Sequence, residues 1–523
     1  MKDGMVTTEN PLGTKPLGRL LFSLAVPTAI ANVVNALYNI VDQIFIGQGV
    51  GTLGNAATSV SFPLTTICLA TGLMLGLGAA SGFNLELGQA HAAASIPEIR
   101  RAHEERAREI VARATGAMVF FGVIILILVR LFLYPMLRAF GTTDTIMPYA
   151  EDYAGITSWG IPFLIFMMGT NPIVRADRSP HYSMAAVITG AVLNTVLDPV
   201  FIFVCGWGIA GAAWATVISQ VVSAVMLAAY FPRFQSVHFK WSDFLPQCSV
   251  PVIKDNQEDT SADPADTLKN TAVTADDLAD AAEETAGSFI EALTDYVRTV
   301  LYVCRLGINS LIFQMSTVIV QITMNNMLRI YGADSVYGSD IPIAVCGIVM
   351  KINVIFIALM IGLISGAQPI CSYNYGAGKY SRVHGTVRLF TIWAIIIGTF
   401  SWLIFQLFPD KIILLFGNGG GNALYFEYAE RFMRTFLFFT FINGIQVCSA
   451  TFFPSIGKPL RGAFISFSKQ ILILMPLLLI LPRFYGLDGI MYAQPATDFL
   501  AAIISVSFLA YEMHIMPRED IHA

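Results

Sequence analysis

The hydrophobic residues of this chain fall in long blocks that are bounded by charged residues, glycine or proline. Most blocks are about 20 residues long, the length at which an α-helix crosses a hydrocarbon core of about 30 Å. Polar and apolar positions do not alternate within the blocks, which predicts helices rather than the strands of a barrel. Twelve spanning helices are predicted, near residues 19–46, 58–83, 110–137, 152–174, 182–204, 209–231, 306–330, 342–367, 385–408, 427–452, 461–482 and 488–512.

Composition strengthens this interpretation. The chain is 55% hydrophobic, its mean hydropathy is +0.64, and only 13% of its residues are charged, against about 25% in soluble domains. The predicted fold class is therefore an all-α polytopic membrane protein. The seven cysteines show no CxxC spacing, and the motifs HExxH, GxSxG and the Walker loop do not occur. We therefore expect neither an enzyme nor a cofactor.

Lysine and arginine are concentrated in alternate connections. Most of the 31 basic residues lie in the N-terminal tail, in the connections after every second predicted helix and in the C-terminal tail. Cytoplasmic loops of membrane proteins carry this excess of positive charge. Both tails, residues 1–18 and 513–523, are therefore expected in the cytoplasm, with the helices in the cell (plasma) membrane.

A long polar segment separates the predicted helices into an N-terminal lobe, residues 19–231, and a C-terminal lobe, residues 306–512. The segment, residues 232–305, is acidic at its centre and contains few aromatic residues, a composition that cannot bury enough surface to fold alone. We expect a disordered cytoplasmic linker, in which residues 275–298 are the stretch best suited to a surface helix.

The two halves resemble each other in sequence. Gly78-Ala79 is matched by Gly366-Ala367, and the turn Gly208–Gly211 is matched by Gly486–Gly489. Each half spans the membrane six times, so the two copies have the same orientation. Parallel repeats of this kind are typical of transporters, in which the substrate path lies between the lobes.

Carboxylates within membrane helices are costly and mark functional sites. Asp42 lies late in the first predicted helix, and Asp198 lies in the fifth, one helical turn after Asn194. Pro199 cannot donate a backbone hydrogen bond, so the carbonyl group of Thr195 is left free beside them. These oxygen atoms suit a small cation, and without a metal ion two close carboxylates would resist double ionisation and carry a proton. The alternative is that both acids lie at the membrane interface.

Other polar residues within the predicted helices have less specific patterns. Two interpretations of Lys351 and Asp498 are open: both residues are functional, or they satisfy the hydrogen-bonding and charge requirements of each other or of backbone groups. Pro27 should kink the first helix and supply a hinge. The residues expected to line a central cavity, or alternatively to join helices to each other, are Lys351, Gln321, Asn325, Gln368 and Gln446. The second half has no counterpart of the acid pair, so ion chemistry is expected in the N-terminal lobe.

The stretch from Asn35 to Gly47 resembles the first helix of the multidrug and toxic compound extrusion (MATE) family. The stretches from Arg175 to Ile202 and from Gly211 to Thr216 are also similar to that family. The resemblance implies a twelve-helix antiporter that exports amphipathic, often cationic compounds in exchange for H⁺ or Na⁺. It also implies that Pro27 bends the first helix. The implied cation-coupling residues are Asp42, Asp198, Asn194, Thr216, Asn171 and Tyr38, of which Asp42, Asn194, Asp198 and Thr216 would bind Na⁺.

Two rival functions follow from the sequence. A flippase or exporter of lipid-linked saccharides has a similar architecture but needs cationic side chains for phosphate groups, and only Lys351 is an obvious candidate. A non-transporting membrane receptor is the rival from another class. We expect a monomer in the lipid bilayer that binds small amphipathic organic substrates and no nucleic acid.

Overall fold

The computed structural model describes residues 10–521 apart from residues 94, 141, 143, 240, 245–274, 339 and 416–422. Over this described part the chain forms helices and connecting turns and contains no strand. The N-terminal half contains α1 (Pro11–Thr14), α2 (Leu17–Gly49), α3 (Thr52–Ala92), α4 (Pro97–Ala139), α5 (Met147–Ser158), α6 (Ile161–Ala176), α7 (Pro180–Pro199), η1 (Val200–Val204), α8 (Gly208–Ala228), η2 (Phe231–Arg233) and η3 (Trp241–Phe244). The C-terminal half contains α10 (Ala275–Ala333), α11 (Asp340–Gly376), α12 (Tyr380–Leu407), α13 (Pro409–Leu415), α14 (Ala423–Phe436), α15 (Thr440–Ser455), α16 (Pro459–Phe467), η5 (Ser468–Leu474), α17 (Met475–Tyr485) and α18 (Leu487–Ile515).

Each predicted span corresponds to a helix or to a pair of helices. Ten helices of the described residues are long and apolar enough to cross a membrane, and the bent pair α14–α15 makes an eleventh. That pair is bent by 51° where the helix is interrupted between Phe436 and Thr440. The remaining predicted span, residues 152–174, is divided into α5 and the shorter apolar helix α6. The sequence therefore predicted the number of spans but not the two interruptions.

Helix α10 begins at Ala275 and continues without interruption to Ala333. It includes residues 275–298, the stretch best suited to a helix in the expected linker, and it runs on past residue 306, the predicted start of the C-terminal lobe. Its 59 residues correspond to about 90 Å of helix, three times the thickness of a hydrocarbon core. Arg113 on α4 holds the N-terminal part of α10 by a 2.6 Å ion pair with Asp295. The central linker, residues 245–274, lies outside the described residues.

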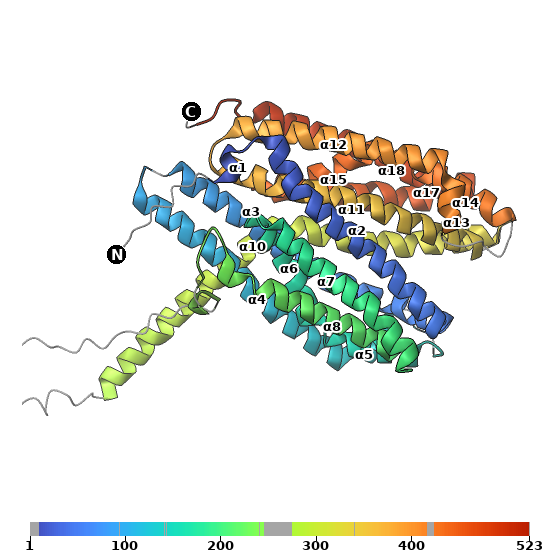
Figure 1. Ribbon diagram of the computed structural model, residues 1–523, viewed down its shortest axis with the longest axis horizontal. Helices are drawn as coiled ribbons and strands as arrows, with labels where there is room; N and C mark the ends of the chain where they lie inside the picture. Colours follow the sequence, from blue (N-terminus) through green and yellow to red (C-terminus); the bar gives the residue numbers. More distant parts are fainter. Residues whose placement is uncertain are drawn as a thin grey trace, which may run out of the picture.

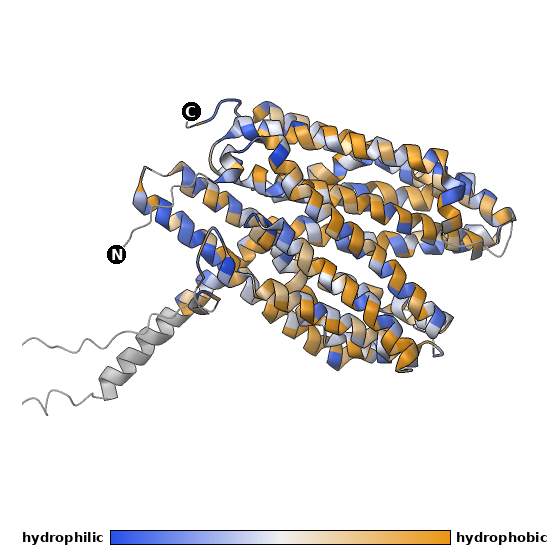
Figure 2. Cartoon of the chain, in the orientation of Figure 1, coloured by the Kyte–Doolittle hydropathy of each residue, from blue (hydrophilic) through white to orange (hydrophobic). Residues whose placement is uncertain are grey.

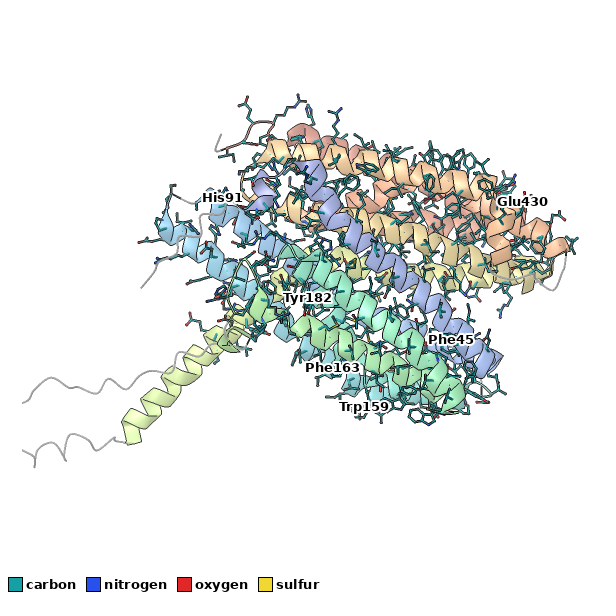
Figure 3. All side chains as sticks on the ribbon, in the orientation of Figure 1. Phe45, His91, Trp159, Phe163, Tyr182 and Glu430 are labelled. Atoms are coloured by element: carbon teal, nitrogen blue, oxygen red, sulfur yellow. The ribbon has the colours of Figure 1, made fainter. Side chains whose placement is uncertain are left out.

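The helices form two groups that correspond to the two sequence halves (Figure 1). Helices α3–α8 form the N-terminal lobe and α10–α18 the C-terminal lobe, and α1 and the end of α18 lie at one end of the molecule, which we call the terminal end (Figure 1). Hydrophobic residues cover the middle of the bundle, whereas hydrophilic residues are more frequent towards its ends (Figure 2). Figure 3 shows Phe45 and Glu430 on separate lobes at the end opposite the termini, and His91 at the terminal end.

Glycines bring the lobes into backbone contact in the half of the molecule nearer the terminal end. A Cβ atom on Gly78 of α3 would meet the backbone of Val303 on α10, and one on Gly307 of α10 would meet the backbone of Met74 on α3. Further along α3, Gly88 and Gly376 of α11 make the same kind of contact. We call these four glycines the glycine seal. A 2.8 Å hydrogen bond from Gln368 Nε2 to Ser81 Oγ joins the lobes between the glycine contacts.

Helix α2 contacts both lobes. Near its start, Ala25 and Ala29 pack against Gly366 and Gly362 of α11, and Phe22 packs edge-on to Trp393 of α12 with ring centroids 4.8 Å apart. At its other end, Gly49 packs against Ile202 and Phe203 of η1. The helix is continuous from Leu17 to Gly49, so the kink predicted at Pro27 does not interrupt it in this conformation.

Candidate functional site

The acid pair predicted from the sequence is brought together by α2 and α7. Asp42 on α2 lies within hydrogen-bonding reach of Asp198, which is close to the end of α7. Asn194, one turn earlier on α7, donates to Asp198 Oδ1 at 3.3 Å. Asp198 is fully buried and Asn194 is 2% exposed, so protein encloses both side chains.

Three oxygen atoms of this cluster are buried without a protein partner. They are Asp42 Oδ1, Asn194 Oδ1 and Asp198 Oδ2. Buried polar atoms are almost always hydrogen-bonded, so three unpartnered acceptors on adjacent side chains need an explanation. Each oxygen can accept a hydrogen bond or contact a cation, and the oxygens of an ionised carboxylate or an amide have no hydrogen to donate. The chemistry of these oxygen atoms fits H⁺ or Na⁺.

Hydroxyl groups complete the surroundings of the acid pair. Thr216 on α8 shares a hydrogen bond with Tyr153 on α5. Both Tyr38 and Tyr153 are close enough to interact electrostatically with Asp42 and Asp198. Tyr153 was missed by the sequence analysis, because it lies at the start of the predicted span 152–174 and belongs to no motif that we recognised.

Apolar side chains close the site at the end opposite the termini. Ile46 of α2, Ile202 of η1 and Ala212 of α8 form a small buried cluster, against which Phe45, Val50 and Tyr153 pack. The backbone changes from an α-helix to the π-helix η1 immediately after Asp198-Pro199. Such π-segments often occur at functional sites. The acid pair thus lies in an apolar enclosure, where an uncompensated charge is most costly.

The other predicted site residues are distributed more widely. The amide oxygen of Asn171 accepts a hydrogen bond from Arg175, and its nitrogen is buried without a partner; none of its described contacts is to the acid pair. Gln368 joins the lobes instead of facing an open space. Gln446 is 2% exposed, and Gln321 donates to Asn325 at 3.0 Å.

Lys351 and Asp498 do not pair with each other. Asp498 lies 3.0 Å from the ammonium group of Lys469 on η5, and the two side chains are 3% and 8% exposed. Lys351 is half-buried on α11 and forms no ion pair among the residues that the structure covers. Lys469 was overlooked because it is a single charge at the centre of a predicted span, and its partner is distant in sequence.

The MatE family model matches residues 27–200 and 312–480, one match in each lobe. The multidrug export protein MepA of Staphylococcus haemolyticus is 20% identical over 95% of this chain and 93% of its own length. The FAD transporter of Shewanella oneidensis is 21% identical over 93% of each chain. The probable multidrug resistance protein YoeA of Bacillus subtilis is 28% identical, over 44% of this chain and 49% of YoeA.

Solved structures with the same fold include MATE in complex with MaL6, which has a TM-score of 0.79 at 20% identity and covers 97% of this chain and 98% of that one. A MOP superfamily transporter from Pyrococcus furiosus, described as having a binding pocket of reverse polarity, also has a TM-score of 0.79 at 20% identity over 97% and 98% of the two chains. The duplicated helical fold and the family match in both lobes lead to one assignment: this chain belongs to the MatE family of membrane efflux transporters.

Proposed function

We propose that this protein is a cation-coupled antiporter, which exports amphipathic organic cations in exchange for H⁺ or Na⁺. The observation that carries the proposal is the set of three buried, unpartnered oxygen atoms on Asp42, Asn194 and Asp198. An ionised pair of this kind is costly in an apolar enclosure. Binding of an ion lowers this cost, so we expect ion binding to favour one conformation over the other. The multidrug export proteins among the relatives supply the substrate class.

The transport cycle follows from the two kinds of contact that the lobes make. The glycine seal closes the terminal end. We expect this end to face the cytoplasm because it carries the excess of basic residues, so we propose that this conformation is closed towards the cytoplasm. Binding of a cation neutralises the acid pair and favours one arrangement of α2. The bound organic cation favours the other arrangement. Two states with different affinities for the two ligands are sufficient for alternating access.

Transport in proteoliposomes tests the proposal directly. Purified protein is reconstituted with a fluorescent organic cation, and its movement is followed under a pH gradient or a Na⁺ gradient imposed separately. Movement that depends on one gradient, and that collapses when an ionophore dissipates it, supports the antiporter. Equal movement with and without either gradient contradicts cation coupling.

An anionic substrate is a second candidate, because Lys351 is a half-buried cation without an ion-pair partner among the described residues. The name of the Shewanella relative indicates a dinucleotide, and a flippase for lipid-linked saccharides would also carry phosphate. Competition by FAD in the same vesicles, lost in K351Q, would favour this candidate. Competition by organic cations that K351Q does not alter would exclude it.

Pro27 is expected to permit the movement of α2. Replacement by alanine restores a backbone N–H group and straightens the preferred path of the helix. We expect P27A to retain the ion-dependent stability of the native protein, while its transport rate falls by roughly tenfold. Initial rates of vesicle uptake, normalised to inserted protein, provide the measurement. An unchanged rate would show that the hinge lies elsewhere.

A further inference from the structure

The C-terminal lobe contains a second buried polar cluster, which we call the lysine cluster. Its members are Lys469 on η5, Asp498 and Gln494 on α18, and Asn443 on α15. The Lys469 ammonium group lies 3.0 Å from Asp498 Oδ1 and donates to Asn443 Oδ1 at 2.6 Å. Gln494 Nε2 donates to the same oxygen of Asp498 at 3.0 Å. The ammonium group therefore bridges three helical segments of this lobe.

The lysine cluster shares one repeat position with the surroundings of the acid pair in the other lobe, whereas its charged residues lie at different positions. Counting from the matched glycines Gly208 and Gly486, Gln494 on α18 corresponds to Thr216 on α8. The fifth helix of each repeat also changes to a π-helix, η1 in the first repeat and η5 in the second. Lys469 is the second residue of η5. Both lobes thus place a buried carboxylate and amide groups beside the same kind of backbone irregularity.

The two clusters differ in what satisfies their oxygen atoms. In the N-terminal lobe, Asp42, Asn194 and Asp198 each present an acceptor without a protein partner. In the lysine cluster, Oδ1 of Asp498 and Oδ1 of Asn443 are both engaged by the ammonium group of Lys469. A lysine ammonium is a compact point charge with three donors, so it can do for these oxygens what a free cation does for the acid pair.

We propose that Lys469 is a tethered cation, which permanently fills the polar core of the C-terminal lobe and leaves the N-terminal lobe as the one that exchanges its ion. Removing the ammonium group should convert the lysine cluster into a site for a small free primary ammonium ion. The contrast between the lobes rests on the proposed function. The test measures thermal stability and not transport, so its failure can be distinguished from a failure of cation-coupled transport.

The test compares thermal unfolding of purified full-length variants. Removing one partner of a buried ion pair leaves the other charge uncompensated, so K469A is expected to unfold about 5 °C below the native protein. Ethylammonium chloride at about 100 mM should recover at least half of this loss by binding in place of the missing group. Choline chloride at the same concentration has no N–H donor and should recover none.

Two further variants separate a tethered cation from simple packing. In K469A/D498N the buried charge is also removed, so the loss should shrink and ethylammonium should have no effect. If K469A alone does not fold, recovery of folded K469A/D498N supports the proposal and its failure to fold overturns it. K458A is the matched control, because its partner Glu512 on α18 keeps an ion pair with Arg461. It should show no response to ethylammonium.

Two results would overturn the proposal. The first is K469A with native stability, which would mean that the ammonium group compensates no charge. The second is a loss in K469A that neither ethylammonium nor the D498N substitution reduces, which would assign Lys469 a packing role alone.

Discussion

Replacing Asp198 with asparagine is expected to reduce gradient-driven efflux by on the order of 100-fold. Placing a charge inside a membrane helix costs about 2.5–3.5 kcal/mol, and this free energy would no longer couple the ion to the conformation. Asparagine keeps the size of the side chain and its hydrogen bond with Asn194, but it cannot be ionised. The ion gradient then no longer distinguishes the two conformations. Initial efflux rates from proteoliposomes, with and without the gradient, measure the effect.

D144N is the matched control for D198N. Asp144 is an exposed carboxylate of the same lobe, paired with Arg138 at the surface, and exposed pairs contribute little. Its variant should transport at the native rate. D198N should insert and unfold like the native protein, so that lost transport cannot be attributed to lost protein. Native gradient-driven transport in D198N would remove Asp198 from the coupling site.

Enlarging a glycine of the seal is expected to have the second large effect. In G307L, the new Cβ atom would overlap the backbone of Met74 on α3, and a backbone cannot rotate away as a side chain can. The lobes must therefore separate at the terminal end. We expect transport to fall by at least about tenfold, because one of the two conformations is destabilised by more than about 1.4 kcal/mol.

Cysteine labelling measures the separation directly. Ser81 is fully buried beside the seal, so S81C, in a background without the natural cysteines, should react slowly with a maleimide that is supplied from the terminal end. S81C combined with G307L should react faster. G347L is the control, because a Cβ atom on Gly347 meets nothing within 4 Å. Equal labelling in S81C with and without G307L would show that the seal does not control access.

The sequence predicted the features that depend on short-range pattern. Apolar blocks identified the spans, and the spacing of Asn194 and Asp198 placed both on one face of a helix. Asp42 and Asp198 were grouped because two intramembrane acids are costly, and in the structure their carboxyl groups are close enough to interact. The cost of burying charge is a strong constraint, because it leaves few arrangements that are stable.

Features that depend on packing between distant segments were not predictable in the same way. The Lys469–Asp498 pair joins residues of different helices, and Tyr153 reaches Thr216 across the lobe. The continuity of α10 across residue 306 was not predicted, because an acidic, alanine-rich stretch has the composition of a disordered segment. Its helix continues into a span, and that continuation is not encoded in local composition.

The position of α2 has a consequence for building hybrids between related transporters. The linker is the obvious place to join the N-terminal half of one protein to the C-terminal half of another. Yet Ala25 and Ala29 lie against Gly366 and Gly362 of α11, so such a hybrid would set a foreign helix surface into a contact where one extra methyl group does not fit. The better junction lies within α2, beyond Ala29, with the first turns taken from the donor of the C-terminal half. Ancestry divides this protein at the linker, whereas its packing divides it inside its first membrane helix.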